Sequence, residues 1–184
     1  MNSRAIRRLT ATILSRQMES GRHGTIDEKR LREALTIGPQ LTEKENSLLL
    51  LSPVARDDWN RIRTLILNDM RDKIAEQGLD TSLVSLAAST DIEDGQVLIP
   101  GSDFSVTLYR QDTQGIPWVI LVQLGPAYRN TIYPMTCLRL VDEGGLEWMR
   151  GYPDAEGEIT SAWLDRNLDL HVRARKYSLK LEPV

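Results

Sequence analysis

Residues that commonly bind metals or form disulfides are scarce in this sequence of 184 residues, which contains one cysteine, Cys137, and two histidines, His23 and His171. A single cysteine excludes an internal disulfide bond, and these three residues are too few for a structural zinc site. The glycine spacing matches neither the dinucleotide fingerprint nor the phosphate-binding P-loop. We therefore predict no metal and no cofactor, and a reducing, cytoplasmic setting.

Long apolar runs are also missing, because none approaches the roughly 18–20 residues that a membrane-spanning helix needs. Hydrophobic residues make up 41% and charged residues 27% of the chain, which is close to the globular average. We expect a soluble protein without membrane contact.

Aromatic residues are nearly absent from the first half, where Trp59 is the only one before residue 86, whereas nine follow it. Eight of the twelve glycines also lie in the second half, and the net charge changes from +2 over residues 1–85 to −5 over 86–184. Aromatics favour strands and glycines favour hairpin turns. We predict an α+β protein with a small helical bundle over 1–80, a linker over 81–95 and an antiparallel β-sandwich over 96–184.

Capping residues predict where the helices of the first half begin. Residues 3–20 form an amphipathic basic segment with Ile6, Leu9 and Ile13 on one face, which favours a docked first helix over a mitochondrial presequence. The beginnings of three further helices are predicted by Thr25 with Glu28, Thr42 with Glu45, and Ser52 with Pro53. Gly78 is predicted to end the last of these helices. Its buried stripe is Trp59, Ile62, Ile66, Met70 and Ile74, and its ion pairs are Asp57–Arg61 and Asp69–Lys73.

Four consecutive leucines, Leu48 to Leu51, would be spread around nearly the whole circumference of a helix. Such a turn is buried on all sides or meets a partner. Core burial is the interpretation we favour, because exposed apolar patches are uncommon on monomers.

Turn signals recur every 8–12 residues after residue 91 and predict seven or eight antiparallel strands over 96–182. Residues 118–122 are apolar at both parities, so this strand should be central and covered on both faces. Alternation of Leu168, Leu170 and Val172 predicts another strand, with His171 on its solvent face.

No catalytic constellation stands out. Neither histidine is placed to activate a nucleophile, and Cys137 fits a small core residue. The acidic turn with Asp154, Glu156 and Glu158 matches a hairpin better than a calcium loop. A small enzyme that uses Asp154 or Glu158 as a general acid stays open as an alternative.

Two segments resemble known families. Leu41-Thr-Glu-Lys-Glu45, the four leucines, Ser52-Pro-Val-Ala-Arg56 and Trp59 resemble the helical segment of bacterial anti-sigma-factor-like regulators. Leu146-Glu-Trp-Met-Arg-Gly-Tyr-Pro-Asp-Ala-Glu-Gly-Glu-Ile159 resembles a hairpin of transthyretin-like or carboxypeptidase-regulatory-like β-sandwiches. The zinc signature of anti-sigma factors and a membrane helix are missing, so the resemblance implies a metal-free, cytosolic variant.

We therefore expect a non-catalytic cytosolic regulator or adaptor that binds a protein partner, which the resemblance suggests is a sigma-like transcription factor. An alternative is a nucleic-acid-binding accessory protein that uses the basic first helix, although a pI near 5.5 argues against it. The predicted partner-binding residues are Arg4, Arg7, Arg8, Arg16, Leu48, Leu49, Leu50 and Leu51.

Overall fold

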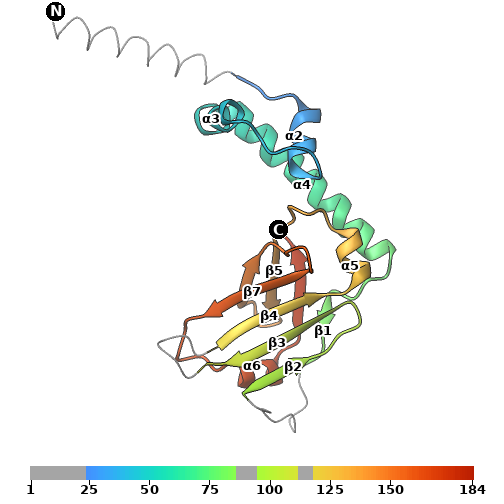
Figure 1. Cartoon of the computed structure of the whole chain (residues 1–184), viewed down its shortest axis with the longest axis vertical. Helices are drawn as coiled ribbons and strands as arrows, with labels where there is room; N and C mark the ends of the chain where they lie inside the picture. Colours follow the sequence, from blue (N-terminus) through green and yellow to red (C-terminus); the bar gives the residue numbers. More distant parts are fainter. Residues whose placement is uncertain (1–23, 86–94, 112–117) are drawn as a thin grey trace, which may run out of the picture. The chain divides into compact units, whose positions relative to one another are not determined.

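The computed structural model describes residues 24–85, 95–111 and 118–184. The chain divides into two compact units, Met1–Asn68 and Asp69–Val184, and the division falls within one helix (Figure 1). The predicted α+β class is confirmed, because helices come first and two antiparallel sheets follow. The predicted helix over 3–20 lies outside the described residues, as do residues 86–94 of the predicted linker.

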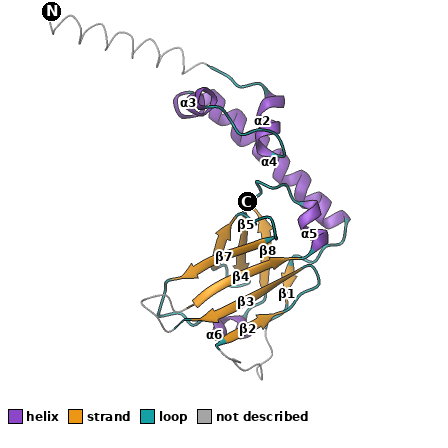
Figure 2. Ribbon diagram, viewed as in Figure 1, coloured by secondary structure: helices purple, strands orange, loops and turns teal. Residues whose placement is uncertain are grey.

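Three helices follow one another in the first half of the described chain (Figure 2). They are α2 (Glu28–Leu35), α3 (Glu43–Leu51) and α4 (Pro53–Glu76). The capping box of Thr42 and Glu45 is confirmed. The predicted pair of Thr25 and Glu28 is wrong, because Asp27 caps α2 by accepting hydrogen bonds from the backbone of Lys29 and Arg30. Asp27 directly precedes the first helical residue, and aspartate caps at least as well as threonine.

Helix α4 begins and ends where its capping residues predict. The Ser52 hydroxyl accepts a hydrogen bond from Ala55 N at 3.2 Å. At the other end Gly78, with φ +65°, donates to Ala75 O and Leu79 N donates to Ile74 O, the pattern of a Schellman cap. The four aliphatic residues of the predicted stripe are buried and Trp59 is half-buried.

Only one of the two ion pairs predicted along α4 forms. Lys73 pairs with Asp69 at 2.8 Å, as expected. Arg61 pairs with Glu28 and Asp58 instead of Asp57, because α2 brings the Glu28 carboxylate within 3.2 Å of its guanidinium.

The second unit contains two four-stranded antiparallel sheets that pack as a sandwich, and Figure 2 shows them as separate layers of strands. One sheet has the order β1-β8-β5-β6 and the other β2-β3-β4-β7. The strands are β1 (Ser82–Leu83), β2 (Gln96–Ile99), β3 (Phe104–Arg110), β4 (Trp118–Leu124), β5 (Leu138–Asp142), β6 (Glu147–Gly151), β7 (Glu158–Trp163) and β8 (Leu179–Pro183). Two short helices accompany them, α5 (Pro126–Thr131) and α6 (Leu170–Lys176).

Strand β4 occupies the predicted central position, between β3 and β7. Trp118, Ile120 and Val122 are buried, and they alternate with Val119 and Leu121, which are only half-buried. The prediction that this strand is covered on both faces is therefore wrong, because only one face of its sheet packs against the sandwich core. The apolar residues on the other face are shielded in part.

The strand predicted around His171 is wrong, because Leu170–Lys176 forms α6. The Asp169 side chain accepts hydrogen bonds from the backbone of His171 and Val172 and thereby caps a helix. Leu170, His171 and Ala174 are buried, a spacing typical of one helical face. The alternation that favoured a strand covers too few residues to distinguish the two-residue period of a strand from the 3.6-residue period of a helix.

The last turns of α4 belong to the second unit and contact its other elements. The Thr136 hydroxyl lies 3.5 Å from Met70 Sδ, Lys73 Nζ donates to the Tyr133 hydroxyl at 3.2 Å, and the Thr131 hydroxyl donates to Gln77 Oε1 at 2.6 Å. A fragment that keeps these contacts starts no later than Asp69. The domain boundaries predicted at residues 80 and 96 stay predictions.

A buried carboxylate connects three elements of this unit. Asp142, at the end of β5, accepts hydrogen bonds from Trp148 Nε1 at 2.8 Å and from Leu146 N at 3.0 Å, and it forms a two-point ion pair with Arg173 of α6. Burial alone would raise the pKa of this carboxyl, but the guanidinium and the two N–H donors outweigh it and lower the pKa. Asp142 is therefore charged in the folded protein at neutral pH.

Asp142→Asn removes the negative charge and leaves the largely buried Arg173 without its counterion. We expect a loss of about 3 kcal/mol in the free energy of unfolding. Because the folded-state pKa lies below the ordinary value of 3.8, this stabilisation is complete well above that pH and is lost as the pH falls through the folded-state pKa. Urea unfolding monitored by tryptophan fluorescence at several pH values should therefore show the two proteins converging in acid. A difference that is independent of pH would contradict this origin.

Tyr128 of α5 is fully buried, and its ring packs edge-to-face on Phe104 with 6.4 Å between centroids. Its hydroxyl oxygen has no hydrogen-bond partner among the described residues. Burial, with a smaller contribution from the nearby Asp103 and Glu182 carboxylates, raises the pKa of this phenol above its ordinary value. The hydroxyl group is therefore a destabilising feature of an otherwise apolar contact.

Tyr128→Phe should raise the free energy of unfolding by about 1 kcal/mol, because it removes an unsatisfied polar group and keeps the ring contact. Tyr109→Phe is the matched control, since Tyr109 is exposed and the same change there should have little effect. Chemical denaturation of both variants tests the prediction. Destabilisation by Tyr128→Phe would show that the hydroxyl contributes a favourable interaction.

Candidate protein-binding site

The leucine run ends in an exposed apolar surface where α3 meets α4. Leu50 is 75% exposed, Leu51 40% and Val54 46%, and we call these three residues the junction surface. No residue of α3 is buried, and Leu48 and Leu49 are half-buried. The core burial that we favoured for the four leucines is therefore wrong. The physical reason is that α3 is attached to its neighbours through polar contacts.

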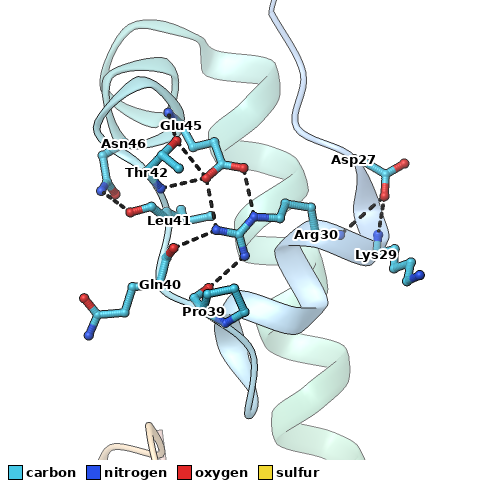
Figure 3. Close-up of polar contacts among 9 residues, drawn as sticks. All are labelled: Asp27, Lys29, Arg30, Pro39, Gln40, Leu41, Thr42, Glu45 and Asn46. Carbon is cyan, nitrogen blue, oxygen red and sulfur yellow. Dashed lines mark hydrogen bonds and ion pairs between the residues drawn. The ribbon is translucent and has the colours of Figure 1, made fainter.

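The first of these contacts is made by Arg30 of α2 (Figure 3). Its guanidinium donates to both carboxylate oxygens of Glu45, at 2.9 and 3.1 Å. The same group donates to the carbonyl oxygens of Pro39 at 2.8 Å and Gln40 at 2.7 Å. One side chain thus joins α2, the connection between the helices and the first turn of α3. The planar guanidinium supports this because it carries five donors in a fixed geometry.

Glu45 is also part of the capping box of α3. Its Oε2 accepts hydrogen bonds from Thr42 N at 2.7 Å and from the Thr42 hydroxyl at 3.0 Å, while Glu45 N donates to the Thr42 hydroxyl. The Thr42 N–H and then the Arg30 guanidinium lower the pKa of Glu45. The same carboxylate therefore caps α3 and attaches it to α2.

Ser52 fixes the other end of α3. This serine is fully buried, its backbone N–H donates to Leu48 O at 2.8 Å, and its hydroxyl donates to Gly24 O at 2.8 Å. Gly24 lies so close to the Leu48 side chain that an added Cβ would clash with it. The chain entering from Gly24 thus covers part of Leu48 and leaves the junction surface exposed.

A positive charge lies beside the junction surface. The Arg56 guanidinium donates to Leu50 O at 3.3 Å, which satisfies a carbonyl at the end of α3, a helix with no basic residue in its last turn. Arg56 is itself exposed. The apolar surface is therefore bordered by a cation, an arrangement common at protein interfaces.

The remaining predicted site residues are placed as follows. Arg4, Arg7, Arg8 and Arg16 lie outside the described residues, so their role stays a prediction. Val54 was missed as a surface residue, although its position two residues after Ser52 and at the start of a helix could have indicated that it flanks the leucines. Arg30 was missed because a partner 15 residues away leaves no periodic signal in the sequence.

The structure also locates the other chemical candidates. Asp154 is exposed on the turn between β6 and β7, Glu158 is half-buried at the start of β7, and Cys137 is half-buried. Within residues 24–85, 95–111 and 118–184, no group of three or more His, Cys, Asp and Glu side chains could hold a metal ion. The helices in these ranges are also too short or too polar to cross a membrane.

Comparison with known proteins adds no family. No protein-family model matches this sequence, and neither curated proteins nor solved structures give a significant match. Only the architecture agrees with the resemblances noted in the helical segment and in the β-hairpin: helices are followed by two four-stranded antiparallel sheets.

Ser52→Ala should lower the free energy of unfolding of the first unit by about 1–2 kcal/mol, because it removes the α4 cap and the donor to Gly24 O. The matched control is Ser47→Ala in α3, whose exposed hydroxyl donates only to Glu43 O within its own helix. There we expect little change, since alanine is the better helix former. Urea unfolding monitored by far-UV circular dichroism compares the two, and equal effects would contradict the role given to Ser52.

Proposed function

We propose that this protein is a regulator or adaptor that binds another protein through the junction surface. The observation that carries the proposal is the exposure of Leu50, Leu51 and Val54 at one helix junction. Exposed apolar side chains that gather at one place in a fold are typical of protein interfaces. The polar contacts of Arg30 and Ser52 support it further, because they hold α3 in place without using these leucines.

The junction surface has the features of a preorganised binding site. Both ends of α3 are fixed by hydrogen bonds, so little conformational entropy remains to be lost when a partner binds there. The partner would present an apolar helix face or groove, and an acidic group placed beside Arg56 would add specificity. The resemblance to anti-sigma-factor-like regulators makes a sigma-like transcription factor the first partner to test.

The test compares variants in quantitative co-purification of the full-length chain from its native cell. Leu50→Glu with Leu51→Lys replaces both leucines of the junction surface with charged residues and leaves the net charge unchanged. Once the captured protein is identified, its affinity for purified wild type and variant should differ at least about thirtyfold, as for interface hot spots. Circular dichroism establishes that the variant keeps its helices.

The matched control is Leu164→Glu, because Leu164 is 68% exposed and lies in the second unit. This substitution should leave the affinity unchanged. Equal loss of binding in both variants, unaltered binding by the double variant, or elution of the wild-type protein alone at low and moderate salt would each contradict the proposal.

A further inference from the structure

The second unit contains a pocket of about 340 Å³ that is separate from the junction surface. It lies between α5, with the segment that follows this helix, and the turn that joins β6 to β7. Its lining includes Arg129, Ile132, Tyr133, Pro134, Pro153 and Asp154. The volume is near the lower limit for small-molecule sites, and the wall combines apolar side chains with a few charged groups, as such sites do.

Arg129 is held in position on one wall. Its Nη1 donates to Glu156 O at 3.0 Å. Its aliphatic stem lies against Gly157, where an added Cβ would clash with it and where φ is +82°, a conformation that favours glycine. These two contacts fix the direction of the guanidinium and use one of its three nitrogens, so others are able to bind an anionic group.

Asp154 is oriented in the same way by the turn. Its Oδ1 accepts hydrogen bonds from Glu156 N at 3.0 Å and Glu158 N at 2.8 Å. Within the described residues these bonds occupy one carboxylate oxygen, and Oδ2 is left to bind a cationic group. Arg129 and Asp154 thus line one pocket with opposite charges, the guanidinium bound to a backbone carbonyl and the carboxylate to two backbone N–H groups.

The apolar part of the wall is formed by Ile132, Tyr133, Pro134 and Pro153. Ile132 is buried, and the two prolines have restricted backbones. The Tyr133 hydroxyl accepts a hydrogen bond from Lys73, whose ammonium group lies 5.5 Å from the centroid of the ring. This wall therefore offers an apolar surface in the same pocket as the two charges.

We propose that this pocket binds a free α-amino acid with an apolar side chain. Its carboxylate would pair with Arg129, its ammonium group with Asp154, and its side chain would pack on Ile132, Tyr133 and the prolines. A simple anion would face the Asp154 carboxylate and a simple cation would face the Arg129 guanidinium, whereas a zwitterion complements both charges.

The experiment is an NMR titration of the full-length, ¹⁵N-labelled chain with L-leucine and with L-phenylalanine. We expect saturable shifts of the backbone amides of residues 129–133 and 154–157, the pocket segments whose residues carry an N–H. N-acetyl-leucine lacks the ammonium group and leucinamide lacks the carboxylate, so each should bind at least about tenfold more weakly than leucine. Equal binding of either analogue, or the absence of saturable shifts with both amino acids, would overturn the proposal.

Variants of the pocket test the location. Arg129→Gln and Asp154→Asn should each weaken leucine binding at least about tenfold, and asparagine keeps the Oδ1 acceptor that the turn requires. The controls are Arg166→Gln and Asp165→Asn, because Asp165 accepts a hydrogen bond from Asn167 N in a similar turn outside the pocket. Unchanged affinity in the pocket variants, or equal losses in the controls, would place binding elsewhere and overturn the proposal.

Discussion

The two-point ion pair of Arg30 and Glu45 is the interaction that holds α3 on α2 in the first unit. It supplies what α2 and α3 lack, since Leu31 is the one buried residue of α2 and α3 has none. Burial of apolar surface normally fixes a helix on its neighbour. Here a charged network attaches α3 from its polar side, and this attachment leaves the end of the leucine run exposed.

A comparable network organises the second unit, with a different purpose. Asp142 and Arg173 belong to a unit that has an ample apolar core, so they add specificity to an arrangement that is already favoured. Their network specifies how α6 meets the β5–β6 hairpin. Even the surface turn is constrained, because a Cβ at Gly144 would lie 2.8 Å from Arg173 Nη2 and 3.1 Å from Asp142 Oδ1. The charged pair therefore limits which residue the exposed turn accepts.

The elements that the sequence predicted well are those stabilised by neighbours in the chain. Thr42 with Glu45, Ser52 with Pro53, and Gly78 act within a few residues, so their spacing is visible in the sequence. The number of strands was predictable in a similar way, because turn signals are local: the described residues after 95 contain seven strands, β2 to β8, within the seven or eight predicted.

The features that the sequence did not predict depend on residues far apart in the chain. Arg30 with Glu45 and Asp142 with Arg173 join residues 15 and 31 positions apart, and nothing local indicates such a pair. The alternation from Leu168 to Val172 is too short to distinguish a helix from a strand. The Asp169 side chain caps the backbone there and favours the helix. The exposed leucines could not be predicted from composition, because their position depends on those distant polar contacts. The pocket likewise depends on Arg129 meeting a turn 27 residues away.

The place of β8 inside its sheet has a consequence for how the second unit folds. β8 separates β1 from β5, and it pairs Lys180 with Ser82 across most of the unit. Until this strand docks, β1 has no partner in the sheet and β5 presents an open edge. Pairing over such a sequence distance is slow, and unpaired edges invite association between chains. Docking of β8 should therefore be a late folding event, and the intermediates that precede it the species most prone to aggregate.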